Sequence, residues 1–237
     1  DKSKSVVVYN AIKAKDRPPP DKIEFRNNLK LPYDKFIVAS VVSFNTPKNV
    51  PLIIAIAKQL AKNKNILFAV IGDGEQKRQI EELIKSENLI NILLLGSTND
   101  VTQYLFASDL YLSTSLWEGM PYSLIEAAAA GLPIIASNVT GNNEVVQNEE
   151  NGFLFELNQP EKAEQYLKSA LDNGAALAQP YVNLADLYRS QQREKEGEAI
   201  LRLGIKQSQN PAPIHHSLGL LLVRNKRVDE ALKELEK

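Results

Sequence analysis

Two carboxylates, Glu118 and Glu126, lie within the most apolar stretch of the chain, SLWEGMPYSLIEAAAAGLP (115–133). A helix that only packs in a core has no use for either side chain. Residues 115–133 predict a turn at Gly119 and a helix from Pro121, whose free amides and positive dipole end would favour phosphate. Carboxylates accept hydrogen bonds from hydroxyls, two at a time from a vicinal diol. The stretch predicts a site for a sugar-phosphate compound; the alternative is that both carboxylates only complement the helix dipole.

Positive charge is scarce in this part of the chain. No lysine or arginine stands between Lys85 and Lys162. An anionic ligand held by the middle of the sequence therefore depends on backbone amides, or on cations that another segment supplies.

Composition excludes several classes of function. The chain has 237 residues and a formal net charge of −1, which suggests neither nucleic acid nor an anionic membrane as a partner. The absence of cysteine excludes disulfides and thiolate metal sites. We find no apolar run that could span a bilayer, and no Ser/His/Asp arrangement of a hydrolase. The two histidines, His215 and His216, are adjacent and would point to different helix faces, which argues against a shared metal.

The elements that position the carboxylates alternate between strand and helix. Apolar, β-branched runs predict strands at 6–10, 36–42, 66–72, 91–95, 109–114, 133–137 and 152–156. Amphipathic segments at 50–63 and 75–88 predict helices between them, and Gly131 predicts the end of the helix that begins at Pro121. This alternation is typical of a doubly wound α/β domain with a parallel sheet, whose ligands bind at the carboxyl ends of the strands.

A different pattern follows, which is helical and repeats. Five positions recur 34 residues later with similar types, namely Leu184, Ala185, Tyr188, Gly197 and Leu201, which correspond to Leu218, Gly219, Leu222, Ala231 and Leu235. The segment from about Glu161 to Lys237 resembles tetratricopeptide repeats, which have this period; two unrelated helical hairpins are the alternative. We predict domains at 1–160 and 161–237, with the helix at 160–173 either shared or a junction.

Further motifs carry a resemblance to a known family. They occur in order as Tyr9-Asn-Ala-Ile, Pro47-Lys48-Asn49, Ile71-Gly-Asp-Gly-Glu, Glu118-Gly-Met-Pro with Glu126-Ala, Ala130-Gly-Leu-Pro-Ile-Ile-Ala-Ser, Gly141-Asn-Asn-Glu-Val-Val and Asn151-Gly-Phe-Leu. The chain resembles, over about Ser5 to Asp172, the nucleotide-sugar half of retaining GT-B glycosyltransferases of family four. The fold implied is one Rossmann-like half of a GT-B enzyme, followed by the helical repeats.

The resemblance implies a role for each matched residue. Glu126 would hold the ribose diol of the donor nucleotide, and Glu118 would contact hydroxyls of the donor sugar. Lys48 would neutralise the leaving diphosphate. Backbone around Gly119, Met120 and Pro121 would face the sugar and diphosphate, and Gly96, Ser97 and Thr98 would lie near the base. No metal or other cofactor is implied, because this class uses basic side chains and a helix end.

The sequence departs from the family at two points. Val42 and Ser43 stand where the family has Gly-Arg, so the arginine that would partner Lys48 on the diphosphate is absent. One lost charge-assisted bond costs about 1.5–3 kcal/mol, which predicts a weak donor site. A GT-B enzyme also needs a second Rossmann-like domain for the acceptor. We expect that domain to precede Asp1 or to be missing, which would leave this chain inactive alone.

The resemblance implies a glycosyltransferase of the hexosyltransferase type that retains configuration. Its partners would be a nucleotide-sugar, the acceptor domain, and a protein or peptide in the groove of the repeats. We expect it in the cytoplasm, free or at the membrane periphery. The alternatives are a degenerate domain that supports a protein-interaction scaffold, or an engineered or truncated chain joined between 158 and 174.

Overall fold

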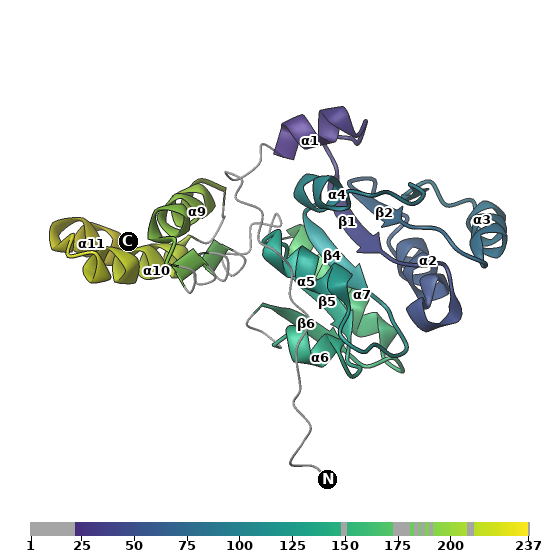
Figure 1. The fold of residues 1–237 in the computed structure, drawn as a ribbon. Coiled ribbons are helices and arrows are strands. Elements are labelled where there is room, and N and C mark those ends of the chain that lie inside the picture. The colour runs from purple at the N-terminus through teal and green to yellow at the C-terminus, as the bar shows by residue number, and fades with distance from the viewer. Residues whose placement is uncertain are drawn as a thin grey trace, which may run out of the picture.

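The chain folds into a sheet covered by helices and a separate group of helices (Figure 1). The computed structural model describes residues 22–147, 151–172, 181, 182, 185, 188, 189, 192–207 and 211–236. The strand predicted at 6–10 and the Tyr9 motif lie outside these residues, as does Leu184 of the repeat pattern.

Six strands form one parallel sheet. They are β1 (Phe36–Val41), β2 (Ile66–Ile71), β3 (Ile92–Leu94), β4 (Leu110–Ser113), β5 (Ile134–Ser137) and β6 (Gly152–Phe155). Their order is β3-β2-β1-β4-β5-β6, and every pair is parallel. The order reverses between β1 and β4, which leaves a crevice at the carboxyl ends of these two strands. The predicted doubly wound, Rossmann-like fold is confirmed.

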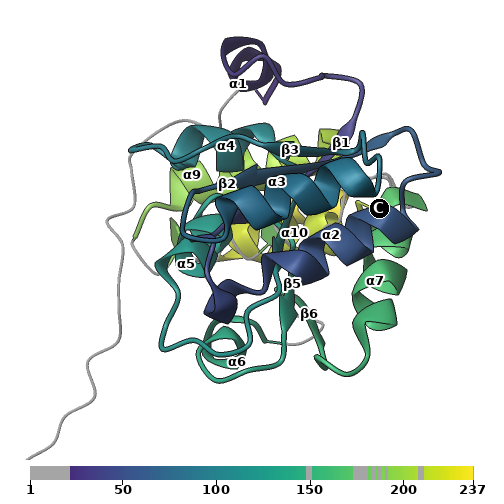
Figure 2. The same cartoon turned by 90° about the vertical axis from the view of Figure 1, so that its right-hand side faces the viewer.

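Helices cover both faces of the sheet (Figures 1 and 2). They are α1 (Lys22–Asn28), α2 (Val50–Gln59), α3 (Lys77–Ser86), α4 (Thr102–Ala107), α5 (Tyr122–Ala129), α6 (Asn142–Val145) and α7 (Pro160–Asp172). One core packs α2, α3 and α7 against side chains such as Phe68 and Leu112. The other packs α1, α4, α5 and α6 against neighbours such as Ala69 and Tyr111. Alternate side chains of each strand therefore serve opposite cores, which explains why the strands are apolar throughout.

The junction helix α7 belongs to the first of these cores. Ala163, Leu167 and Ala170 are buried there, against the sheet and α2. Helix α7, at Pro160–Asp172, therefore closes the α/β part. The division into 1–160 and 161–237 stays a prediction.

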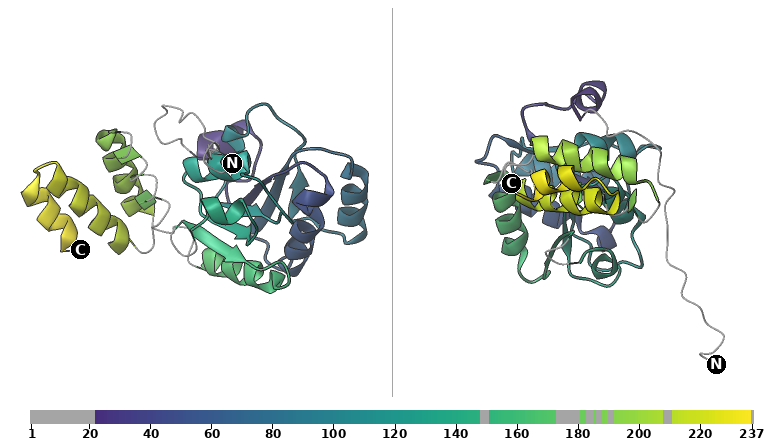
Figure 3. Two further views of the ribbon diagram at one scale, coloured as in Figure 1. Left: turned by 60° about the horizontal axis from the view of Figure 1, so that its bottom comes forward. Right: turned by 90° about the vertical axis from the view of Figure 1, so that its left-hand side faces the viewer.

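The remaining helices pack in the way expected of repeats. They are α9 (Glu194–Gln207), α10 (Ala212–Arg224) and α11 (Val228–Leu235), and they lie side by side beside the α/β part (Figures 1 and 3). Small residues allow the close crossings, because a Cβ at Gly219 would lie 2.5 Å from Leu235 Cγ and one at Gly204 would lie 2.5 Å from Tyr181 Cγ.

The histidines of α10 differ as predicted. His215 is buried, with Nδ1 2.6 Å from Glu234 Oε2, and His216 is exposed. None of the helices that the structure describes has the length and apolarity needed to cross a bilayer.

Candidate functional site

Two loops meet at the crevice between β1 and β4. The first follows β1 and ends in the short 3-10 turn η2 (Thr46–Lys48); the second follows β4 and leads to α5. The amide of Leu116 donates to Pro47 O at 2.8 Å. The buried hydroxyl of Thr114 lies 3.1 Å from the carbonyl oxygen of Lys48. These bonds fix the backbone of the lysine loop against the loop that carries Glu118.

The two loops bring Lys48 and Glu118 together. The Lys48 ammonium lies 2.5 Å from Glu118 Oε1, and both side chains are largely shielded, with 23% and 10% of their surface exposed. Ser115 Oγ donates to the same carboxylate oxygen at 2.6 Å. A cation and a carboxylate that are 70 positions apart in sequence thus share one place at the edge of the sheet. Neither charge needs an external partner to be stable there.

Helix α5 begins beside this pair, one residue later than predicted. Pro121 is the N-cap, with extended backbone (φ −74°, ψ 117°), and not the first helical residue. Its carbonyl accepts the first bond of the helix, from Leu124 N at 3.1 Å. An extended proline suits this place because its φ fits and its missing N–H is not needed there. Gly131, with φ +76°, ends the turn after the helix, as predicted.

Glu126 lies in α5 and is partly buried. Its charge reaches the hydroxyl of Tyr111, a residue of β4 that is 1% exposed. Burial, together with the charges of Glu118 and Glu126, raises the pKa of Tyr111 to about 12, although bonds with Ser123 and the backbone partly oppose this. One buried phenol therefore experiences the charges of both carboxylates.

The turn after Glu118 is open on one side and tightly packed on the other. A Cβ at Gly119 would meet no atom within 4 Å. By contrast, a Cβ at Gly141 would lie only 2.2 Å from Gly119 O, and Gly141 has φ +87°. The loop before α6 therefore supports the acidic turn from beneath and leaves space above Gly119. Met120 is partly buried in the same turn.

The other predicted residues lie on neighbouring loops of this edge. Ser43 is exposed directly after β1. Gly96, after β3, accepts a 2.8 Å bond from Gly72 N, and the exposed Ser97 follows it. Thr98 Oγ1 accepts a bond from Asp100 N at 3.2 Å. The hydrogen bonds described here for Gly96 and Thr98 go to other loop residues and not to the Lys48–Glu118 pair, and the roles of all these residues stay predictions.

The Gly72-Asp73-Gly74 turn has a structural explanation. A Cβ at Gly72 would lie 1.8 Å from Val42 O, and one at Gly74 would lie 2.6 Å from Phe44 O. These glycines let the turn after β2 pack against the loop that carries Ser43. Backbone of this chain, and not a ligand, is what approaches them.

Several buried polar residues of the site were not singled out by sequence reasoning. They are Tyr111, Ser113, Thr114, Ser115, Ser137 and Asn142, each at most 5% exposed. A buried serine or tyrosine in a strand looks like ordinary core. Ser137 and Asn142 lie in two of the family motifs, but neither motif gave them a role.

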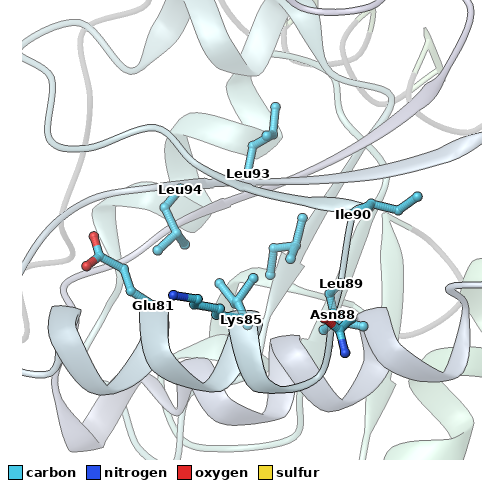
Figure 4. A pocket seen from close by; sticks show the side chains of 9 residues that line it. Glu81, Lys85, Asn88, Leu89, Ile90, Leu93 and Leu94 are labelled. Carbon is cyan, nitrogen blue, oxygen red and sulfur yellow. The ribbon is translucent and has the colours of Figure 1, made fainter.

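A hollow of about 420 Å³ lies elsewhere, between α3 and the edge strand β3 (Figure 4). Its walls are mainly apolar, with Leu89, Leu93 and Leu94 among them, and Glu81 and Lys85 stand at its side. None of the predicted site residues lines this hollow.

Comparison with known families assigns two segments of the chain. A family model described as "Glycosyl transferases group 1" matches residues 21–185. A tetratricopeptide-repeat model matches residues 178–211.

A curated relative supports the first assignment. The UDP-Gal:alpha-D-GlcNAc-diphosphoundecaprenol alpha-1,3-galactosyltransferase of Escherichia coli is 41% identical over 118 residues, which are 47% of this chain and 30% of the relative. The chain thus spans about a third of the length of the curated relatives that it matches.

Solved structures agree on the fold. TarM of S. aureus, determined in complex with UDP, aligns with a TM-score of 0.62 at 22% identity, over 91% of this chain and 39% of TarM. Anabaena HepE in complex with UDP aligns with a TM-score of 0.61 at 18% identity, over 92% of this chain and 54% of HepE.

Proposed function

Because the chain belongs to the glycosyl transferases group 1 family, we propose that it supplies the donor-binding domain of an enzyme that transfers a glycosyl group from a nucleotide-diphospho-sugar. The observation that carries this proposal is the Lys48–Glu118 pair beside the N-terminus of α5, at the crevice between β1 and β4. Open-sheet α/β proteins bind their ligands at such a crevice. TarM and HepE, which share the fold, were solved with UDP.

Different residues of the site bind different parts of the donor in this proposal. Lys48 and the N-terminus of α5 face the diphosphate, because both supply positive charge. Glu118 accepts hydrogen bonds from the donor sugar, and Glu126, one turn inside the helix, accepts them from the ribose diol. Backbone at Gly119, where a side chain is absent and space is open, lets the sugar approach. Gly96 and Ser97 lie on the loop that would border the base.

The same groups support the chemical step. The bond between the anomeric carbon and the diphosphate oxygen breaks, and its electron pair leaves with the diphosphate. Lys48 and the amides of α5 stabilise the negative charge that forms there. Glu118 stabilises the positive charge on the sugar ring. The acceptor hydroxyl then bonds to the anomeric carbon from the face that the diphosphate leaves and gives its proton to the departing diphosphate oxygen, so configuration is retained. No resident metal is needed, since the cation and helix end already oppose the leaving charge.

A further domain binds the acceptor in this proposal. The group 1 relatives are about three times longer than the segment they share with this chain. The chain alone is therefore expected to bind donor with little or no turnover. The repeats would hold the enzyme at its acceptor or at a protein partner.

The alternative is an interaction protein whose α/β part only supports the repeats. The observation that favours it is a set of exposed apolar side chains on α10 and α11, namely Leu220, Val223, Val228, Leu232 and Leu235. Exposed apolar surface of this kind is typical of protein contacts. This alternative predicts that no nucleotide binds to the α/β part.

A thermal-shift screen separates the two functions. UDP, ADP, GDP and their glucose derivatives are added to the chain, and the melting temperature is recorded. A ligand at 100 times its Kd adds about 2.7 kcal/mol of stability, which raises the melting temperature by roughly 5–10 °C in a protein of this size. No shift with any of the six compounds would contradict the donor-binding proposal.

Two variants then assign the site. Glu126→Ala should weaken binding of the active nucleotide diphosphate about 10-fold or more, since it removes charge-assisted bonds to the ribose. Glu161→Ala, on the exposed side of α7, is the matched control and should bind like the wild type. Equal affinities for the wild type and Glu126→Ala would contradict the role of Glu126.

A further inference from the structure

A chain of buried hydrogen bonds reaches Glu118 from behind the site. Asn142, which is 0% exposed, donates from Nδ2 to Ser137 O at 3.0 Å and lies 3.2 Å from Ser137 Oγ. Ser137 Oγ donates to Ser115 O at 2.6 Å, and Ser115 Oγ donates to Glu118 Oε1 at 2.6 Å. Two serines therefore connect Asn142 to the carboxylate that pairs with Lys48.

Asn142 also acts on the other side of Glu118, through its neighbour in sequence. Gly141 packs against the turn that follows Glu118, because its Cβ position would lie 2.2 Å from Gly119 O and 2.9 Å from Glu118 Cβ. The side-chain bonds hold Asn142 in place, and Asn142 in turn fixes Gly141. The loop at 115–119 is thus held both before and after its carboxylate.

The residue type at 142 is not the one that stability alone would favour. Asn142 Oδ1 is buried and has no hydrogen-bond partner. Turning the amide over would not help, since Oδ1 would then face the carbonyl oxygen of Ser137. A buried polar atom without a partner is unfavourable, and an apolar side chain would avoid it. The hydrogen bonds that Asn142 Nδ2 makes to Ser137 are what offset this cost.

We propose that Asn142 is a positioning residue that holds Glu118 for the donor sugar through Ser137 and Ser115. The contribution to the sugar site rests on the proposed function. The effect on the loop at 115–119 does not, and it can be measured without any ligand. Asn142 touches neither the donor nor the reacting atoms in this proposal.

Asn91 offers a matched control. It is 3% exposed, donates from Nδ2 to a single carbonyl, that of Ala57 at 2.8 Å, and also buries an Oδ1 without a partner. Its position before β3 is remote from the acidic loop in the sheet order, since β2 and β1 separate β3 from β4. Asn91→Ala thus repeats the chemical loss of Asn142→Ala without touching the network.

The first measurement is hydrogen exchange of the intact chain, read by mass spectrometry on the segment 113–120. The amide of Leu116 lies in this segment and donates to Pro47 O, so its exchange rate measures how firmly the loop is held. Asn142→Ala should raise exchange in this segment at least 10-fold while exchange in β2 changes less than 2-fold. Ser137→Ala, which removes the middle link, should act in the same direction. Asn91→Ala should leave the segment within 2-fold of the wild type.

The second measurement is calorimetry with UDP and UDP-glucose as probes. Asn142→Ala should reduce the affinity for UDP-glucose about 10-fold more than the affinity for UDP, because Glu118 faces the sugar and not the nucleotide. A simple loss of stability would weaken both ligands alike. Equal losses for UDP and UDP-glucose would overturn the positioning role.

The exchange result decides the inference independently of ligand binding. Unchanged exchange at 113–120 in both Asn142→Ala and Ser137→Ala, or an equal rise in Asn91→Ala, would overturn it. Failure of the wild type to bind either probe would count against the proposed donor, while the exchange data would still support or overturn the hold of Asn142 on the loop.

Discussion

Lys48 and Glu118 neutralise each other across the crevice between β1 and β4, with Nζ and Oε1 2.5 Å apart. The pair has consequences for a ligand that enters. A diphosphate would draw Lys48 toward itself, and a sugar hydroxyl would take a share of Glu118. Because each charge has a partner, neither is an isolated buried charge, which would be unfavourable.

The first prediction concerns the energy of this pair. Lys48→Met and Glu118→Gln should each lower the free energy of unfolding by about 1–3 kcal/mol, because each leaves a shielded charge alone. The cost stays below that of a fully buried pair since water still reaches Lys48. Urea denaturation of the two single variants and the double variant measures this free energy. The double variant should lose less stability than the two single variants lose together.

An exposed ion pair provides the control for this cycle. Arg78 and Glu82 on α3 are 90% and 65% exposed. Arg78→Met should change stability by less than about 0.5 kcal/mol. If Lys48→Met also changes the free energy of unfolding by less than about 0.5 kcal/mol, the Lys48–Glu118 pair contributes no more than an exposed ion pair.

The second prediction concerns the missing arginine. Ser43 is exposed directly after β1. Ser43→Arg should raise the affinity for UDP by roughly 10- to 100-fold, because a guanidinium adds a charge-assisted bond to the diphosphate of about 1.5–3 kcal/mol. Calorimetry at constant ionic strength measures the change. Ser86→Arg, on the exposed end of α3, adds the same charge away from the site and should have no effect. An unaltered affinity in Ser43→Arg would show that the wild-type site is not weakened at this position.

The third prediction concerns Tyr111 and alkaline pH. Burial and the two carboxylates raise its pKa to about 12 in the folded state, against about 10 when unfolded. The unfolded chain therefore releases the phenolic proton first, and stability falls as the pH rises from 10 to 12. The loss attributable to Tyr111 reaches about 2–3 kcal/mol by pH 12.

Tyr111→Phe removes this pH dependence. Urea unfolding at pH 9, 10, 11 and 12 should show a smaller decline in Tyr111→Phe than in the wild type. At neutral pH the variant should differ by about 1 kcal/mol, from the lost bond to Val41 O. Tyr33→Phe, at a side chain that is 73% exposed, should follow the wild-type curve. Parallel curves for Tyr111→Phe and the wild type would rule out the buried phenol as the cause.

The strands and the acidic turn were predictable because their signals are local. A run such as 66–71 is apolar at every position, which is typical of a strand buried on both faces. Gly131, whose φ of +76° favours glycine, follows the end of α5, as its residue type predicted. The start of α5 was predicted one residue early, since proline is acceptable both at the N-cap and at the first helical position, and only the backbone angles of Pro121 distinguish the two.

The pairing of Lys48 with Glu118 could not be derived from spacing alone. It depends on β4 lying beside β1 and on Thr114 bonding to the lysine loop. The motifs that contain Ser137 and Asn142 were visible, but nothing in the sequence indicated that the two side chains bond each other. Sequence patterns reveal which residues face the core, whereas contacts between distant loops depend on strand order.

The fourth prediction tests the support beneath the acidic turn. Gly141→Ala adds a Cβ that would lie 2.2 Å from Gly119 O, at a φ of +87° that alanine tolerates poorly. Overlap and backbone strain each cost about 1–3 kcal/mol. Gly119→Ala is the matched control for folding, because its Cβ would meet nothing within 4 Å. Urea denaturation should therefore show a large loss of stability for Gly141→Ala and a change below about 1 kcal/mol for Gly119→Ala. Equal stabilities of the two variants would mean that the loop before α6 yields easily and does not hold the turn that carries Glu118.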